Sequence, residues 1–236
     1  MIFAAGEGRR MLPLTLHTPK PLLPLGDPLI GHNHLIGHNL RRLKAAGVQE
    51  VVVNTAYLGA QIHTALGDGS AWGLRIIYSN EPFPLETGGA LRHALPLLHN
   101  QPFLLINADV LCTYPLERLL ARGLAGGELG HLVLVPNPEQ HPQGDFVLDA
   151  RGLLSTASTS ACVNPSYTFS GISVLHPQLI RQYPRAREVF PLREAFGWAI
   201  EQGGLSGEVF DGIWLDVGTP ARLADAQALW MQLSAN

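Results

Sequence analysis

The sequence predicts an α/β fold in which a doubly wound, mainly parallel sheet is joined by a small antiparallel lobe. Two observations lead to this prediction: short apolar segments alternate with helix-like segments along the first half of the chain, and a glycine-rich stretch follows the first apolar segment. The chain has 236 residues, of which 46% are hydrophobic, so a substantial core can form. Because no linker-like or low-complexity segment interrupts it, we expect a single domain over residues 1–236.

Four short apolar segments of the first half are the predicted strands of the parallel sheet. They are Ile2–Ala5, Val51–Thr55, Leu74–Ser79 and Phe103–Ala108. Each is bounded by turn or polar residues and is short enough to be a buried strand. Helices are expected between them at about 29–46, 59–66 and 87–98, which gives the alternation of strand and helix that a parallel sheet requires.

The second half of the chain contains further strand-like segments that we expect to pair partly antiparallel. These are His131–Asn137, Asp145–Leu148, Thr168–Leu175 and Gly212–Trp214. Helices are expected near 177–182, 191–203 and 219–232.

Charge and cysteine usage exclude several classes of protein. The net charge is −3 and the pI is about 6.3, without a basic stripe, so nucleic acid is not an expected partner. Cys112 and Cys162 lie far apart and have no metal-ligand spacing, which favours reduced thiols over a disulfide. The sequence shows no signal peptide and no apolar run of about 20 residues, so we expect a cytoplasmic protein without a membrane partner.

The stretch from Phe3 to Pro24 is the most informative part of the chain. Gly6 and Gly8 follow the first strand and allow the backbone to approach phosphate oxygens without a Cβ in the way. Two arginines come next, and a lone lysine follows between two prolines; these cations are Arg9, Arg10 and Lys20. Backbone amides and cations together are what a polyphosphate requires.

This stretch resembles the signature loop of the sugar-1-phosphate nucleotidyltransferases. The pattern A-A-G-x-G-x-R-M-x-P-L-T is followed by P-K-P-L at Pro19–Leu22. A Rossmann dinucleotide loop would need a third glycine where Met11 stands, and an acidic residue about 20 residues further on. A Walker loop would need G-K-[ST], which is absent here. Both alternatives fit the residues less well.

The resemblance implies a Rossmann-like domain of the nucleotide-diphospho-sugar transferase type, which joins a nucleoside triphosphate to a sugar 1-phosphate and releases pyrophosphate. It divides the domain into a nucleotide-binding part at about 1–110 and a sugar-phosphate-binding part at about 111–236. The nucleotide-binding residues that it implies are Ala5, Gly6, Gly8, Arg9, Arg10, Lys20, Gly88 and Asn107.

Two aspartates are the candidate metal ligands. Asp109 ends a predicted strand, and carboxyl ends of parallel strands lie where ligands bind in α/β sheets. The segment resembles the family's N-G-D-V motif, with Ala108 in the glycine position, and W-x-D-x-G-T-P around Asp216 resembles its late motif. Two carboxylates with phosphate oxygens and water suit Mg²⁺. The catalytic residues implied are Arg10, Lys20, Asp109 and Asp216.

Each aspartate segment also has a structural alternative. Asp109 could be a helix N-cap or a turn residue, and Thr219 with Pro220 looks like an N-cap and first helical residue. The capping role of Thr219 is compatible with metal binding by Asp216.

Three other segments resemble the parts of the family that contact base and sugar. They are L-E-T-G-G at 85–89, Gly144–Phe146 and Phe169–Ile172. The implied substrate-binding residues are Glu86, Thr87, Gly144, Ser170 and Gly171. A helix start capped by Thr87 is the structural alternative for the first segment, and Asn54 and Tyr57 are weaker candidates for the same crevice.

The block Leu29–Asn33 recurs as Leu35–Asn39, which indicates a local duplication. We expect one copy to bulge or to extend the start of the helix. His32, His34 and His38 could form a metal cluster, but no carboxylate or cysteine close by in the sequence completes a site, so we expect them to face solvent.

The short chain, its P-L-T-L-H-T-P-K-P-L run and its L-G-D-G-S-x-W-G-L segment most resemble family members that transfer a uridylyl group from UTP to an amino sugar 1-phosphate of the cell wall. Mannose- or glucose-1-phosphate transfer with GTP, UTP or dTTP is the alternative within the family. A non-catalytic nucleotide sensor is the alternative of another class. The expected partners are the two substrates and Mg²⁺, and the expected state is a monomer or a small homo-oligomer.

Overall fold

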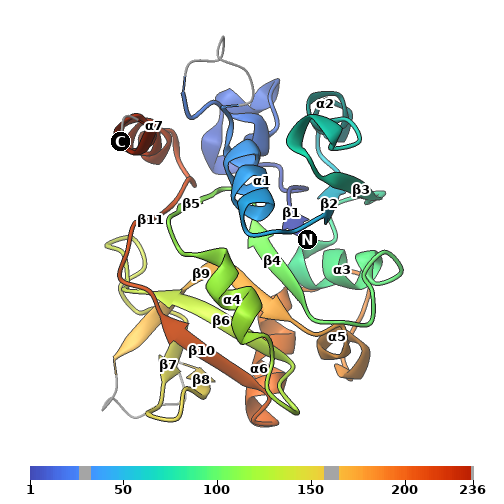
Figure 1. The fold of residues 1–236 in the computed structure, drawn as a ribbon, viewed down its shortest axis with the longest axis vertical. Helices are drawn as coiled ribbons and strands as arrows, with labels where there is room; N and C mark the ends of the chain where they lie inside the picture. Colours follow the sequence, from blue (N-terminus) through green and yellow to red (C-terminus); the bar gives the residue numbers. More distant parts are fainter. Residues whose placement is uncertain (27–32, 157–164, 235–236) are drawn as a thin grey trace. The chain divides into compact units, whose positions relative to one another are not determined.

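The computed structural model describes residues 1–26, 33–156 and 165–234 (Figure 1). The chain divides into two compact units, and both are discontinuous in sequence. The first unit consists of Met1–Pro84, Ile106–Glu117 and Ile213–Asn236, and the second of Leu85–Leu105 and Arg118–Gly212. The single domain over residues 1–236, with its nucleotide-binding and sugar-phosphate-binding parts, stays a prediction.

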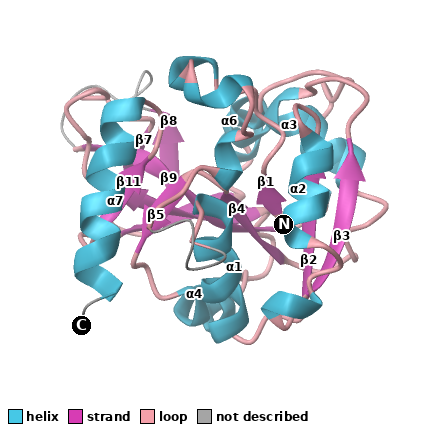
Figure 2. Cartoon of the chain, turned by 90° about the horizontal axis from the view of Figure 1, so that it is seen from above, coloured by secondary structure: helices cyan, strands magenta, loops and turns pink. Residues whose placement is uncertain are grey.

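The first unit is built on parallel strands. β1 (Ile2–Phe3) pairs with β2 (Glu50–Thr55), and β2 pairs with β3 (Arg75–Asn80) (Figure 2). On its other side β1 pairs, again in parallel, with the last two residues of β4 (Phe103–Asn107). Almost every residue of β2 is buried, as expected for the middle of a parallel sheet.

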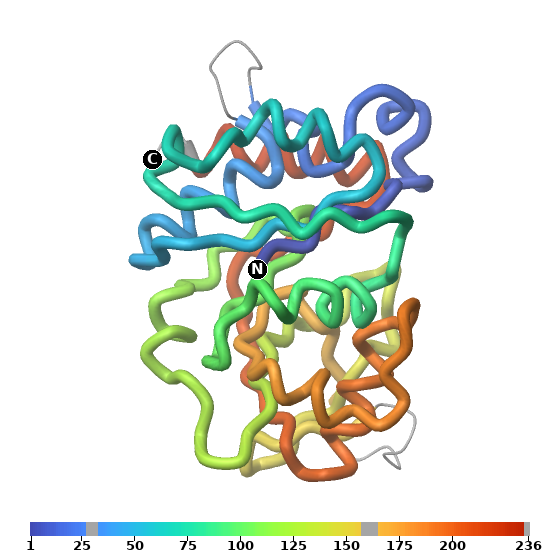
Figure 3. The backbone as a smooth tube through the Cα atoms, turned by 90° about the vertical axis from the view of Figure 1, so that its right-hand side faces the viewer, coloured from blue at the N-terminus to red at the C-terminus, as the bar shows by residue number. Residues whose placement is uncertain are grey.

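Three helices belong to the first unit, namely α1 (Leu35–Ala45), α2 (Gly59–Leu66) and α7 (Pro220–Ser234). The start of α1 is fixed by His34, whose Nδ1 accepts the Gly37 N–H at 3.0 Å. Gly47, with a φ of 85°, follows its end and stops the helix. Segments remote in sequence lie side by side, because Gln227 of α7 donates to the Pro24 carbonyl at 2.9 Å (Figure 3).

The second unit combines strands of both directions. β6 (Gly130–Val135) pairs antiparallel with β9 (Ser166–Leu175) and in parallel with β10 (Leu205–Val209). β7 (Phe146–Leu148) pairs antiparallel with both β8 (Leu154–Thr156) and β9. Within this unit α3 (Glu86–Ala94) and α5 (Gln178–Gln182) pack against α6 (Leu192–Glu201). Short strands and helices thus produce the predicted antiparallel lobe.

The predicted fold class is confirmed, and each predicted strand and helix has a counterpart, with the same bounds for α2 and shifted bounds for the others. The largest shift concerns the helix expected at 29–46, which begins at Leu35; Leu29–His32, most of the first repeat copy, lie outside the described residues. Among the described residues, three strands and one α-helix were not predicted: β5 (Val110–Cys112), β8, β10 and α4 (Leu116–Arg122). β5 and β8 are too short for an apolar period, and β10 reads Leu-Ser-Gly-Glu-Val.

Across the described ranges, no helix has both the length and the apolar character needed to cross a membrane.

Candidate active site

The two candidate metal ligands are brought together by a short antiparallel ladder in the first unit. β11 (Trp214–Asp216) pairs with β5, with Asp216 opposite Val110. The Val217 N–H donates to the carbonyl of Asp109 at 2.9 Å, so the backbones of the two aspartates are adjacent. The structure thus brings the backbones of the two candidate ligands side by side, and metal binding stays a prediction.

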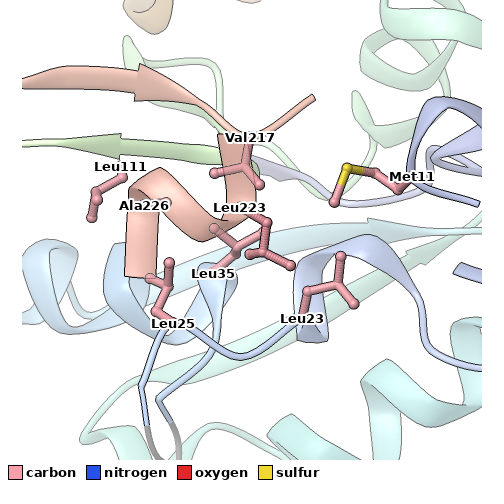
Figure 4. Close-up of a cluster of buried hydrophobic side chains, with 8 residues drawn as sticks. All are labelled: Met11, Leu23, Leu25, Leu35, Leu111, Val217, Leu223 and Ala226. Atoms are coloured by element: carbon pink, nitrogen blue, oxygen red, sulfur yellow. The ribbon is translucent and has the colours of Figure 1, made fainter. Parts of the chain in front are cut away.

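A hydrophobic cluster holds this ladder in place. Leu111 of β5 and Val217 next to β11 are fully buried against side chains from the first loops, α1 and α7 (Figure 4). The other members are Met11, Leu23, Leu25, Leu35, Leu223 and Ala226. Met11, which stands where a dinucleotide loop would have glycine, is therefore a core residue that ties the glycine loop to the aspartate ladder.

Asn39 of α1 fixes the turn that carries Asp109. Its buried side-chain amide donates to the Val110 carbonyl at 3.1 Å and to the Ala108 carbonyl at 3.4 Å. Because both carbonyls that flank Asp109 are held, the direction of this turn is defined. Asn39 belongs to the second repeat copy and was not predicted to serve the site; its only sequence signal is a polar residue within an apolar helix face.

The prediction that the histidines of the repeat face solvent is wrong for His38. Its side chain is buried and meets the Trp230 ring edge-on, with ring centroids 5.2 Å apart. Burial, and then the charge of Arg42, lower the pKa of His38 to about 3, so it is neutral at pH 7. His34 caps α1, and His32 lies outside the described residues. No cluster of three His, Cys, Asp or Glu side chains that could hold a metal exists among the residues that the structure describes.

Each aspartate forms an ion pair with a cation. Lys20 Nζ contacts Asp109 Oδ2, and Arg222 Nη1 contacts Asp216 Oδ1. The two carboxylates retain 29% and 27% of their side-chain exposure, whereas the lysine and the arginine retain only 13% and 15%. The donor set therefore fits Mg²⁺, because two partly open carboxylates offer the hard oxygens that this ion prefers.

Gly6 and Gly8 have different surroundings in the loop after β1. Gly8 has a φ of 64°, and its carbonyl accepts the Met11 N–H at 2.8 Å and the Thr15 hydroxyl at 2.9 Å. A Cβ on Gly8 would lie 3.2 Å from Cβ of Lys20, so the glycine lets the lysine pack closely. Gly6 is exposed, and no atom lies within 4 Å of where its Cβ would be. Its backbone is thus open to a ligand.

Asn54 and Tyr57 support this loop. Asn54 Oδ1 accepts the Ala4 N–H at 2.7 Å, while its amide donates to the buried Glu81 carboxylate at 2.6 Å. The Tyr57 hydroxyl donates to the Thr15 carbonyl at 2.8 Å. Sequence reasoning assigned both residues to the crevice; the structure gives them contacts that fix the loop backbone.

The remaining nucleotide-binding candidates of the first unit lie at the ends of strands or in the loop. Ala5 is buried and Asn107, the last residue of β4, pairs in register with Phe3. Arg9 is 83% exposed and pairs with Glu7, which raises its pKa. Arg10 is exposed, and its Nη2 lies 3.2 Å from where a Cβ of Gly218 would be. Arg10 therefore reaches the segment that follows Asp216.

The second unit contains the L-E-T-G-G candidates, and the structure shows what surrounds the two glycines. Gly88 and Gly89 are buried, and both N–H groups donate to the Phe190 carbonyl, at 2.8 and 3.1 Å. A Cβ on Gly89 would lie 2.1 Å from the Glu188 carbonyl oxygen. These glycines thus permit close packing within the protein. Nucleotide binding by Gly88 stays a prediction.

Thr87 caps a helix other than its own. Its hydroxyl accepts the Leu192 N–H at 2.9 Å, at the start of α6, whereas α3 has no side-chain cap. The expected capping of α3 by Thr87 is therefore wrong. Glu86 is exposed and has a φ of 57°, which is unusual for a residue with a side chain and is often found at binding sites.

The predicted acceptor residues Ser170 and Gly171 form a bulge in β9. Val133 of β6 pairs with Ile172, but Leu134 pairs with Phe169, so two residues of β9 are left over at this point. Gly171 has a φ of 80°, which suits this distortion. Gly144 has a φ of 60° and no room for a side chain beside Asn137. Bulges often lie next to active sites, and contact of these residues with a sugar stays a prediction.

Arg222 is the functional candidate that sequence reasoning missed. It stands six residues after Asp216, in the first turn of α7, where Thr219 acts as the predicted N-cap by accepting the Arg222 N–H at 3.3 Å. The sequence does contain a signal, because the W-x-D-x-G-T-P pattern continues directly into Ala-Arg. An arginine at the third helical position reads first as a surface residue, and only the structure shows its ion pair.

Comparison with known proteins shows which family this chain resembles. The family described as Nucleotidyl transferase matches residues 1–152. The chain is 46% identical to the N-acetylmuramate alpha-1-phosphate uridylyltransferase of Neisseria meningitidis, over 97% of this chain and 96% of that protein. It is 32% identical to the mannose-1-phosphate guanylyltransferase of Mycobacterium tuberculosis, over 93% of this chain but only 61% of that protein.

A solved structure of a candidate glucose-1-phosphate thymidylyltransferase from Bacillus anthracis superposes with a TM-score of 0.82 at 22% identity, covering 97% of this chain and 93% of that one. Structures of HddC from Yersinia pseudotuberculosis give TM-scores of 0.74 and 0.76 at 20% and 18% identity, with 97% of each chain covered. At these identities the structural likeness concerns the fold alone. Together with the matched family and the 46% identical relative, it leads to the conclusion that this chain belongs to the nucleotidyl transferase family.

Proposed function

We propose that the chain is an N-acetylmuramate alpha-1-phosphate uridylyltransferase, which joins UTP and N-acetylmuramic acid 1-phosphate to give the UDP-sugar and pyrophosphate in peptidoglycan recycling. The observation that carries the proposal is the ladder of β5 and β11, which sets Asp109 with Lys20 beside Asp216 with Arg222. The choice of substrates rests on the relative that is 46% identical over nearly the whole of both chains.

In the proposed reaction a phosphate oxygen of the sugar 1-phosphate attacks the α-phosphorus of UTP, and the bond from that phosphorus to the bridging oxygen of pyrophosphate breaks. Mg²⁺ held by Asp109 and Asp216 would neutralise phosphate charge as the new bond forms. We assign no nucleophilic side chain and no general base, because a phosphate monoester is already largely ionised near pH 7. The protein contributes mainly position and charge.

The residues of the first unit bind phosphate in this scheme. The open backbone at Gly6 admits the triphosphate, and Arg10 is exposed beside the turn after Asp216. When Lys20 leaves Asp109, its ammonium group is free to bind phosphates and to reduce their mutual repulsion. The loop is held by the Asn54 and Tyr57 contacts, so its phosphate-binding shape exists before the substrate arrives.

The residues of the second unit are assigned to the sugar and the base. The left-handed backbone at Glu86 is a local distortion at an exposed carboxylate, and the bulge at Ser170 and Gly171 is a second one. Ser170 is buried, and its hydroxyl accepts the Ile172 N–H at 3.1 Å, so its assignment to the sugar rests on the family resemblance alone. A Glu86 carboxylate accepting from a sugar hydroxyl is consistent with its exposure. The monomeric or small homo-oligomeric state and the cytoplasmic location stay predictions.

Transfer to mannose or glucose 1-phosphate is the alternative reaction, and the 32% identical guanylyltransferase is the observation that favours it. A nucleotide sensor without catalysis would be free to lose Lys20 or one of the aspartates. Because the chain keeps both aspartates, each with its cation, we favour an enzyme.

The deciding measurement is pyrophosphate release with Mg²⁺, in which four nucleoside triphosphates are crossed with N-acetylmuramic acid, N-acetylglucosamine, glucose and mannose 1-phosphates. We expect one strong signal, from UTP with the muramic acid phosphate. A strong signal with a different pair would keep the mechanism and refute the substrate. If folded protein releases no pyrophosphate above the noise of the assay with any of the sixteen pairs, the result would favour the nucleotide sensor.

The residue roles are tested by Lys20→Ala and Asp109→Asn. We expect kcat/KM to fall by about a hundredfold or more in each, because a charged group that stabilises the transferring phosphoryl group is worth several kcal/mol. Arg75→Ala, which breaks a surface pair with Glu50 in the same unit, is the matched control and should keep its activity. Near-normal turnover in either site variant would refute the assignment.

A further inference from the structure

We propose that Arg222 and Arg10 together form a clamp for the pyrophosphate end of the nucleoside triphosphate. The sequence motifs place Arg10 at the phosphates but give Arg222 no role. The proposal rests on the proposed function for the identity of the ligand, whereas the clamp itself is argued from the geometry around Gly218.

Gly218 shows that the two guanidinium groups share one small region. If Gly218 carried a Cβ, that atom would lie 2.5 Å from Nη2 of Arg222 and 3.2 Å from Nη2 of Arg10. Both nitrogens therefore lie close to one point and are within about 6 Å of each other. Gly218 is buried and its φ is not left-handed, so the glycine is explained by the space that the arginines need.

The position of Arg222 is defined from two sides. Its backbone N–H is fixed to Thr219 in the first turn of α7, and its guanidinium contacts the carboxylate of Asp216. Its side chain is only 15% exposed, which restricts its rotamers more than those of a surface arginine. A held guanidinium loses less entropy when it binds an anion.

The charges around Gly218 are unbalanced in favour of cations. Arg10 and Arg222 bring two positive charges to Gly218, and Asp216, which contacts Arg222, brings one negative charge. Two guanidinium groups so close repel each other, and an anion between them removes that repulsion. The planar fork of arginine suits bidentate contacts with phosphate oxygens. Inorganic pyrophosphate, the leaving group of the proposed reaction, has the size and charge to contact both.

The test is isothermal titration of the whole chain with inorganic pyrophosphate in the presence of EDTA, so that no metal and no turnover contribute. We expect Arg222→Ala to bind about tenfold more weakly than the wild type, and Arg10→Ala likewise. The double variant should lose less than the product of the two effects, because one ligand bridges both groups. Arg75→Ala is the control and should bind normally.

Gly218→Ala tests the geometry without removing a charge. Its new Cβ would displace the end of Arg222, so we expect weaker pyrophosphate binding from a protein with wild-type circular dichroism. Arg222→Lys keeps the charge and should recover part of the affinity. If Arg222→Ala disturbs folding, these two variants decide the question.

Wild-type affinity in Arg222→Ala or in Gly218→Ala would overturn the clamp and leave Arg222 as a residue that only positions Asp216. Absence of pyrophosphate binding by the wild type would also overturn it. A silent substrate screen combined with intact, Arg222-dependent pyrophosphate binding would refute the proposed function and leave the clamp standing.

Discussion

Two pairs of glycines look alike in the sequence and differ in what the structure asks of them. Gly6 and Gly8 follow β1, and Gly88 and Gly89 lie in the first turn of α3. Both pairs stand in motifs that resemble those of the family. In the structure Gly6 faces open space, whereas a Cβ on Gly88 would meet the ring and carbonyl of Phe190 and a Cβ on Gly89 would meet the Glu188 carbonyl.

The difference lies in what occupies the space where a glycine Cβ would be. At α3 the partner is the chain itself, because the Phe190 carbonyl accepts both glycine N–H groups and leaves no room for a Cβ. At Gly6 no protein atom fills the space where a Cβ would be, and a phosphate group can occupy it. A glycine motif therefore indicates a close approach, and only the structure says whether protein or ligand makes it.

The largest effect is expected at Gly89. Gly89→Ala would set a Cβ 2.1 Å from the Glu188 carbonyl oxygen, a rigid backbone atom, so α3 must move away from residues 188–190. We expect a loss of about 3 kcal/mol in the free energy of unfolding, measured by urea denaturation, since overpacking against backbone cannot relax by a rotamer change.

Gly126→Ala is the matched control in the same unit, because nothing lies within 4 Å of its Cβ position and its φ is not left-handed. It should stay within about 0.5 kcal/mol of the wild type. Equal stability of the two variants would show that α3 can move away from residues 188–190 without cost. Close packing would then not explain Gly89, and contact with a ligand would be the remaining reason for this glycine.

An intermediate effect is expected at Gly8, which combines both reasons. Gly8→Ala must keep a φ of 64° and accept contacts of 3.0 Å with Thr15 and 3.2 Å with Lys20. We expect about 1–2 kcal/mol of lost stability from the left-handed backbone, and weaker pyrophosphate binding because Lys20 is displaced.

Gly47→Ala separates these two costs, since Gly47 has a φ of 85° but nothing within 4 Å of its Cβ position. It should show the conformational cost in urea denaturation and leave pyrophosphate binding unchanged. If Gly8→Ala and Gly47→Ala behaved alike in both measurements, the packing of Lys20 against the loop would have no consequence.

Local patterns and a family resemblance predicted the fold class and the segments that meet at the site, since each depends on a short run of residues. Asp109 and Asp216 could be named because each ends a recognisable motif. That β5 would pair with β11 could not be predicted, because both strands have three residues and their pairing is a tertiary contact.

The supporting residues escaped prediction for a related reason. Asn39 donates to the carbonyls of residues 108 and 110, which are far from it in the sequence. Arg222 contacts the carboxylate of Asp216, which belongs to a different element, strand β11. Thr87 caps α6, more than a hundred residues away. Neither spacing nor composition contains such contacts, whereas burial of a polar side chain such as Asn39 shows at once that a partner must exist.

The smallest effect on stability, and the sharpest contrast with Gly89, is expected at Gly6. Gly6→Ala has an ordinary φ and an empty Cβ position, so urea denaturation should stay within about 0.5 kcal/mol of the wild type. If phosphate fills that space, the added methyl group should weaken pyrophosphate binding by about threefold to tenfold, or roughly 1 kcal/mol. Gly89→Ala would then lose stability alone, as expected for a glycine that the fold requires. Gly6→Ala would lose affinity alone, as expected for a glycine that the ligand requires. Unchanged affinity in Gly6→Ala would mean that the ligand leaves this space empty, and would restrict phosphate recognition in the loop to Arg10 and Lys20.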